Sequence, residues 1–130
     1  MRKFTVFSII SLLILAACAP QQPTEINIPE GSKIVEITAA GYSPNPLTIK
    51  QGEAVTWVNK DAEAHWPASA QHPTHAVYPE TGGCIGSKFD ACKRLAQGDS
   101  WSFTFNEKGE WNYHDHLNPG PPFYGKIVVE

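Results

Sequence analysis

The chain has 130 residues, about the size of one domain, of which 18% are charged and 42% hydrophobic, with a formal net charge of −3 at pH 7. This composition excludes a disordered acidic tail and a helical membrane bundle, and it is typical of a small globular domain. Loss of Arg2 and Lys3 with a removable leader would leave 8 basic against 13 acidic residues, a net charge of −5, so no nucleic-acid partner is expected.

The first 17 residues have the features of a secretory signal. Arg2 and Lys3 form a positive start, and the apolar run 4–15 is too short to span a bilayer. Residues 15–18, Leu-Ala-Ala-Cys, resemble the bacterial lipobox, which implies cleavage before Cys18 and acylation of that residue. We therefore expect an exported protein that is lipid-anchored at the outer face of a bacterial membrane, in the cell envelope or periplasm. The alternative is an ordinary signal with a chance cysteine.

A flexible tether and one β-rich domain are expected after the signal. Residues 18–31 comprise the lipidated cysteine and a segment of Pro, Gln, Thr and Glu with little to bury. In 32–130, short runs of β-branched and aromatic residues alternate with turn signals, which predicts an all-β sandwich. The predicted strands are 33–39, 47–49, 54–59, 101–106, 110–114 and 126–129.

The segments between these runs carry turn and loop signals. Residues 51–53 (Gln-Gly-Glu) and 107–109 (Glu-Lys-Gly) are typical of hairpin turns, and the prolines of 43–46 interrupt any regular ladder. Only residues 89–96 carry a pattern that could form a helix.

The 40 residues between Asn59 and Ser100 contain few strand signals. A loop of that length inside a compact domain is usually functional or disordered. This one holds three histidines, several prolines and aromatic residues, and two cysteines. We therefore expect an ordered flap between the central strands.

The two cysteines of the flap are expected to pair. In an exported protein Cys84 and Cys92 can form a disulfide, and Gly82, Gly83 and Gly86 allow so short a ring to close. In the chain-entropy model such a ring contributes about 2.5 kcal/mol of stability. The alternative is a pair of thiolates that binds a soft metal.

Two parts of the chain resemble a known family. The run 41–59 resembles the opening strands of cupredoxins, which are blue-copper β-sandwiches, and His65 stands where the family has a histidine ligand shortly after the last of these strands. The run 109–129 lies without gaps on the family's ligand loop. The resemblance, which covers 33–65 and 100–130, implies a cupredoxin-like Greek-key β-sandwich with a long ordered loop between the central strands.

The ligand positions of that family are largely replaced. On the gapless register the blue-copper cysteine position holds Asp115, the second histidine position holds Asn118, and the axial methionine position holds Phe123. Only His65 remains of the four usual ligands. Because no thiolate is present to give strong sulfur–copper charge transfer, a blue type 1 centre is not expected.

A second resemblance concerns paired histidines. Residues 111–117, together with His65-Trp66, are similar to motifs of multicopper oxidases, whose cupredoxin domains donate His-x-His pairs to copper. Pro67 stands where the first motif would have its second histidine. The run 72–75 (His-Pro-Thr-His) also resembles a histidine-rich segment of those enzymes. Since one such domain cannot complete a trinuclear cluster, oxidase activity is not expected.

The histidines are expected to gather at one end of the sandwich. On a strand, His114 and His116 share one face, and Asp115 lies on the other. If the aromatic residues fill the core, both histidines face outward, where the flap could cover them. Neutral imidazoles are good ligands for copper and for zinc. The predicted site is mononuclear and consists of His65, His114 and His116, completed by His72 or His75.

Two carboxylates are candidates to support this site. Asp115 could orient an imidazole through its free N–H, ligate the metal directly, or cap a turn. Glu80 is a more distant candidate for the same task.

The leading prediction is a lipid-anchored cupredoxin-like protein that binds a copper ion, with zinc as the second candidate, and handles or delivers copper. One alternative is electron transfer or a small copper redox activity with a redox or copper-donor or copper-acceptor protein as partner. Another is a metal-free β-sandwich used for protein interaction. No catalytic residues are assigned, because no motif for hydrolysis or phosphoryl transfer has the required spacing, and a binding protein is favoured over an enzyme.

Overall fold

The computed structural model describes residues 26–130, so the predicted signal (1–17), the predicted lipidation of Cys18 and much of the predicted tether lie outside the described residues. The described part contains eight β-strands, and no helix in it could cross a membrane. The strands are β1 (Lys33–Thr38), β2 (Gly41–Ser43), β3 (Leu47–Ile49), β4 (Ala54–Asn59), β5 (Pro67–Ser69), β6 (Ser100–Thr104), β7 (Gly109–Asp115) and β8 (Tyr124–Val129).

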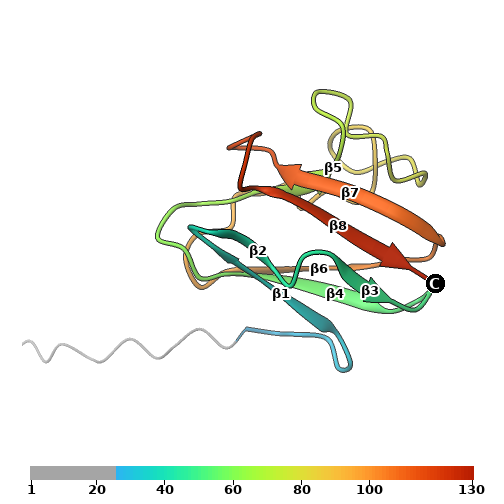
Figure 1. Cartoon of the computed structure of the whole chain (residues 1–130), viewed down its shortest axis with the longest axis horizontal. Helices are drawn as coiled ribbons and strands as arrows, with labels where there is room; N and C mark the ends of the chain where they lie inside the picture. The colour runs from blue at the N-terminus through green and yellow to red at the C-terminus, as the bar shows by residue number, and fades with distance from the viewer. Residues whose placement is uncertain (1–25) are drawn as a thin grey trace, which may run out of the picture.

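The strands form two four-stranded sheets that lie as two layers (Figure 1). One sheet has the order β2-β1-β4-β6 and the other the order β3-β8-β7-β5. Each sheet has one parallel pair, β1 with β4 and β3 with β8, and the remaining pairs are antiparallel. The predicted all-β sandwich is confirmed.

Most strands agree with the sequence pattern. The predicted strands at 47–49 and 54–59 coincide with β3 and β4, and the other four agree to within two residues at each end. The strands β2 and β5 were not predicted, since each is only three residues long. In β5 the first residue is Pro67, and a proline argues against a strand unless it lies at a strand start or an edge. β5 is the edge strand of its sheet, which resolves the conflict.

The two predicted hairpins are wrong. The turn at 51–53 joins β3 to β4, and the turn at 107–109 joins β6 to β7, but in each case the two strands belong to different sheets. The first turn instead binds neighbours from both layers, since Gln51 N donates to Glu130 O (3.0 Å) and Gly52 N donates to Phe105 O (2.7 Å). Turn residues fix a local reversal of the chain, but they do not decide which sheet the next strand joins.

The segment 89–96 is not helical either. It runs alongside the chain near β5, where Ser69 N donates to Phe89 O (2.7 Å) and Leu95 exchanges two backbone hydrogen bonds with His65 (2.7 and 3.1 Å). Phe89 and Leu95 are both fully buried. The apolar side chains that suggested a helix therefore anchor an irregular segment to the core.

The space between the sheets is filled by aromatic and β-branched side chains. Trp57, at the centre of β4, is fully buried, with its ring stacked on Trp101 (centroids 5.1 Å apart) and close to Phe89 (5.4 Å). Tyr113 packs edge-on against Trp57 from β7 in the other sheet. This core fixes β7, so that alternate residues of β7 face away from it.

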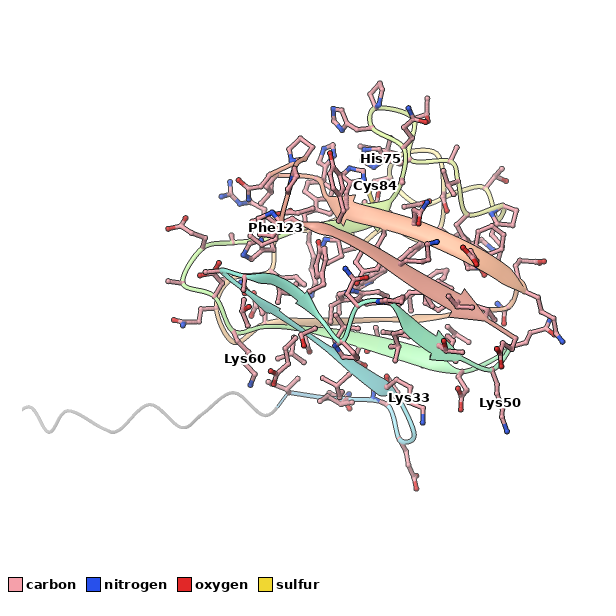
Figure 2. All side chains as sticks on the ribbon, in the orientation of Figure 1. Lys33, Lys50, Lys60, His75, Cys84 and Phe123 are labelled. Atoms are coloured by element: carbon pink, nitrogen blue, oxygen red, sulfur yellow. A yellow bond between two sulfur atoms is a disulfide. The ribbon has the colours of Figure 1, made fainter. Side chains whose placement is uncertain are left out.

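The residues between β4 and β6 form the expected ordered flap, which includes β5, and the loop that follows β5 lies beside β5 and β7 (Figure 1). Tyr78 anchors it, because its ring is buried against Phe103 and Phe105 and its hydroxyl accepts a hydrogen bond from Asn106 N (3.0 Å). The predicted disulfide between Cys84 and Cys92 is confirmed. Figure 2 shows His75 and Cys84 together on this flap, across the molecule from Lys33.

Candidate metal centre

β7 and the residue directly after it carry the first two residues of a histidine cluster, His114 and His116. Tyr113 and Asp115 face the core side of the strand and are buried, so His114 and His116 share the opposite side. β5 pairs with β7 here, with Ala68 opposite His114. His114 is only 2% exposed although it faces away from the core, because the flap covers it.

The flap supplies the other two histidines. Just after β5 the chain makes a turn in which His75 N donates to Gln71 O (2.8 Å), and His72 lies within this turn. His75 has a φ of 53°, a left-handed conformation that costs a non-glycine residue roughly 1–2 kcal/mol. Such local strain persists only where the surroundings impose it, and it is common at functional sites.

The four rings converge on one point. One ligand atom from each of the cluster's residues lies within 4.8 Å of the others, and those residues are His72, His75, His114 and His116. His75 Nε2 is 3.4 Å from His72 Nδ1 and 3.1 Å from His116 Nδ1. Metal–nitrogen bonds of 2.0–2.1 Å at tetrahedral angles would place neighbouring nitrogens about 3.3 Å apart. These two separations are therefore those expected for ligands of one copper or zinc ion, and the remaining pairs lie within 4.8 Å.

Burial keeps the inner imidazoles neutral. Loss of solvent, together with the neighbouring His75 and His72, lowers the pKa of His114 to about 4. Burial, followed by the proximity of His116, likewise lowers the pKa of His75. His114 Nε2 is buried and has no hydrogen-bond partner among the described residues. A buried nitrogen without a hydrogen-bond partner costs free energy of folding. A metal ion would give this nitrogen a partner, because a neutral imidazole nitrogen is the form that binds a metal.

His65 lies outside this cluster. Its Nδ1 is 2.8 Å from Asp115 Oδ2, and its Nε2 is 3.1 Å from Asp61 Oδ2, so a carboxylate faces each ring nitrogen. The hydrogen bond from His65 lowers the pKa of Asp61. The structure thus brings His114 and His116 together with both flap histidines, and it does not bring His65 to them. No pattern in the sequence pointed to Asp61, an acidic residue in a bend after β4.

Asp115 orients His65 and not a cluster histidine. Its Oδ1 accepts hydrogen bonds from the backbone of Trp66 (2.8 Å) and Leu117 (3.0 Å), and its Oδ2 accepts one from Asn118 Nδ2 (2.8 Å). Burial alone would raise the pKa of Asp115, but these hydrogen bonds and the one from His65 outweigh it and lower the pKa. Asp115 is therefore an ionised structural carboxylate.

Glu80 also lies outside the cluster. Its carboxylate accepts a hydrogen bond from Asn106 Nδ2 (3.2 Å) and pairs with Lys88 (3.5 Å). The contact with Asn106 links the flap to the loop after β6, and the contact with Lys88 lies within the flap. The structure therefore gives Glu80 a bracing contact in place of the supporting role suggested by the sequence.

Comparison with known proteins gives consistent matches. A family model described as copper binding proteins, plastocyanin/azurin family, matches residues 29–130. Amicyanin from Paracoccus denitrificans is 30% identical over 103 residues, which cover 79% of this chain and 69% of that protein. Chloroplastic plastocyanin from Chlamydomonas reinhardtii is 31% identical over 96 residues, which cover 71% and 60%.

Solved structures of cupredoxins are similar to this chain in fold. A mutant of amicyanin in the oxidised state superposes with a TM-score of 0.62 at 26% identity, covering 83% of this chain and 95% of that one. A purple cupredoxin from Nitrosopumilus maritimus superposes with a TM-score of 0.60 at 24% identity, covering 76% and 100%. These matches confirm the predicted cupredoxin-like Greek-key sandwich.

The residues that the gapless sequence register assigns to the usual cupredoxin ligand positions lie next to one another. His65, Asp115 and Asn118 are linked by the hydrogen bonds described above, and the ring of Phe123 packs on His65 (centroids 4.7 Å apart). None of these four residues is in the histidine cluster. The cluster is built from the flap and from the side of β7 that faces away from Asp115.

Proposed function

This chain belongs to the plastocyanin/azurin family of copper-binding proteins, and we propose that it binds one copper ion through four imidazoles instead of a blue centre. The observation that carries the proposal is the convergence of His72, His75, His114 and His116, with nitrogen separations of 3.1 and 3.4 Å. Nitrogen sites bind Cu(II) more tightly than Zn(II), and imidazole suits both oxidation states of copper, so copper is the expected ion. When bound, it would supply a one-electron redox couple.

The proposed role is copper handling or delivery. His75 and His114 are buried and His116 is half-buried, whereas His72 is exposed. An exposed ligand can be exchanged for a ligand of another protein while the buried ones keep hold of the ion. We therefore place the first step of copper transfer at His72, with a copper-donor or copper-acceptor protein as the partner.

The proposal includes export and anchoring. The leader sequence and the lipobox-like residues 15–18 support lipidation at Cys18. The disulfide supports an oxidising compartment. A carrier held at the outer face of a membrane would exchange copper with partners of the same envelope.

Electron transfer is the second candidate function. One contact favours it: the ring of Trp66 packs edge-on against His116 (centroids 4.8 Å apart), and neither residue is fully buried. This contact offers a short path from the site to the surface. Reversible reduction of the copper form with rapid electron exchange would favour this role over delivery.

Copper titration of the purified protein tests the proposal. We expect one Cu(II) per chain, nitrogen hyperfine structure in the electron paramagnetic resonance spectrum, and no intense thiolate-to-copper band. The double variant His114→Ala/His116→Ala should lose stoichiometric binding. The matched control His65→Gln should keep it, because His65 is not in the cluster. Loss of copper in the control alone would place the site at His65, and no binding by the unmodified protein would favour a metal-free sandwich.

A further inference from the structure

A buried carboxylate lies directly behind one histidine of the cluster. The side chain of Asp90 is fully buried, and its Oδ2 lies 3.7 Å from His75 Nδ1. Neither of these atoms has a hydrogen-bond partner among the described residues. The other ring nitrogen, His75 Nε2, faces the ring nitrogens of His72 and His116. The imidazole therefore lies between the carboxylate and the centre of the cluster.

The other oxygen of Asp90 is held firmly in place. Asp90 Oδ1 accepts hydrogen bonds from Trp66 Nε1 (2.6 Å) and from Cys92 N (2.8 Å). Cys92 is fixed in turn by its disulfide to Cys84, and an isolated bridge pairs Asp90 with Ala68 of β5. These contacts leave Oδ2 free and direct it at His75.

A buried carboxylate oxygen that has no hydrogen-bond donor is costly. His75 can supply that donor when Nδ1 carries the proton, and this tautomer leaves a lone pair on Nε2, the nitrogen that faces the cluster. A carboxylate on the outer nitrogen of a ligating histidine fixes the tautomer and the ring orientation and makes the ligating nitrogen more basic.

We infer that Asp90 is a positioning residue that holds the Nδ1–H of His75 so that Nε2 is presented to the copper ion. This inference rests on the copper site proposed above. Trp66 extends the arrangement, because its N–H holds Asp90 while its ring packs on His116. Two of the four proposed ligands are thereby held by Asp90 and Trp66, which are not ligands themselves.

Asp90→Asn is the direct test, since it keeps the shape of the side chain and removes its charge. Loss of such a supporting partner typically lowers metal affinity 10–100-fold, and we expect a loss in this range. The reduction potential of the copper form should rise, because a negative charge near the ion favours Cu(II). In the metal-free protein, ¹⁵N NMR of the imidazoles should show His75 mainly as the Nδ1–H tautomer, and Asp90→Asn should remove that preference.

The control is Asp99→Asn, the same substitution at an exposed aspartate that accepts a hydrogen bond from Ala96 N. It should change neither the affinity nor the tautomer of His75. If Asp90→Asn does not fold, Trp66→Phe removes the donor to Asp90 and keeps an aromatic ring, and it should shift the same readouts in the same direction to a smaller extent. The variant Trp66→Phe thus keeps the inference testable.

Two outcomes separate this inference from the copper proposal. Unchanged affinity, potential and tautomer in the Asp90 variant would overturn the positioning role while leaving the copper site in place. Failure of the unmodified protein to bind copper would overturn the proposed function. In that case the tautomer of His75 in the metal-free protein would still decide whether Asp90 holds the imidazole.

Discussion

The surroundings of His114 strongly change the pKa of its imidazole. Its ring lies on the outward side of β7 but is almost fully buried under the flap, with Nε2 unpartnered. Burial and the neighbouring histidines lower its pKa to about 4. A histidine in the unfolded chain has a pKa of about 6.5. The folded, metal-free protein therefore resists protonation in a pH range where the unfolded chain accepts it.

This difference predicts how the stability of the metal-free protein depends on pH. Between pH 6.5 and about 4 the unfolded state binds more protons than the folded state, so the free energy of unfolding should fall as the pH falls. A shift of this size corresponds to roughly 3 kcal/mol for His114, and His75 acts in the same direction. Urea unfolding at a series of pH values measures the effect. In the variant His114→Gln the free energy of unfolding should fall less steeply over this pH range. An equal fall in the variant and the unmodified protein would show that His114 does not cause the pH dependence.

The sequence predicted some features of the site because they depend on local periodicity. The opposite facing of His114 and Asp115 follows from alternation along one strand. The separation of His65 from the cluster could not be predicted in this way, because it depends on how the flap returns across β5. Asp90 gave no signal either, since its value as a partner of His75 comes from contacts with Trp66 and Cys92 that no spacing in the sequence reveals.

At the scale of elements, the flap is shaped by close backbone contacts. Gly86 has a φ of +68°, and a Cβ at this position would lie 2.0 Å from Thr74 O and 3.1 Å from the backbone of His75. The segment carrying the flap histidines therefore packs directly on the backbone of the disulfide ring. Only glycine allows this approach, and the strained backbone of His75 is held partly by it.

We predict that Gly86→Ala weakens copper binding without contacting any ligand side chain, because the segment of Thr74 and His75 must move to make room for the methyl group. A loss of at least tenfold in copper affinity, about 1.4 kcal/mol, is expected. The matched control is Gly98→Ala, which has a similar φ of +87° but nothing within 4 Å of the new Cβ. Both variants share the cost of a left-handed alanine, so isothermal titration with copper isolates the clash. Equal affinities in the two variants would contradict the prediction.

The strand pattern was predictable where a strand is long and central, as in β4, whose residues are nearly all buried. The three-residue strands β2 and β5 lie below the length at which periodicity is informative. The two turns at 51–53 and 107–109 were recognised as turns, but their role as links between sheets depends on pairings across the whole domain. Such non-local pairings are set by packing of the two layers and not by the turn residues.

On the scale of the whole molecule, the histidine cluster joins side chains of the flap to side chains of the sandwich. His114 and His116 come from β7 and its end, whereas His72 and His75 come from the flap. β7 is fixed in the sandwich by its pairing with β8 and by the packing of Tyr113 in the core. A bound ion would therefore tie the flap to the rigid sheet.

We predict that copper stabilises the flap more than the sandwich. At a free copper concentration 1,000 times the dissociation constant, binding to the folded state alone adds about 4 kcal/mol to the free energy of unfolding, which should raise the melting temperature by roughly 10 °C or more. Hydrogen exchange locates the effect. The amides of His75 and Val77, which donate to Gln71 O and Ala70 O within the flap, should be protected on adding copper, whereas core amides of β4 should change only through global stability. The variant His114→Ala/His116→Ala should show neither effect. A higher melting temperature with no added protection at His75 would mean that copper binds without closing the flap onto β7, and the four-histidine arrangement would then be excluded.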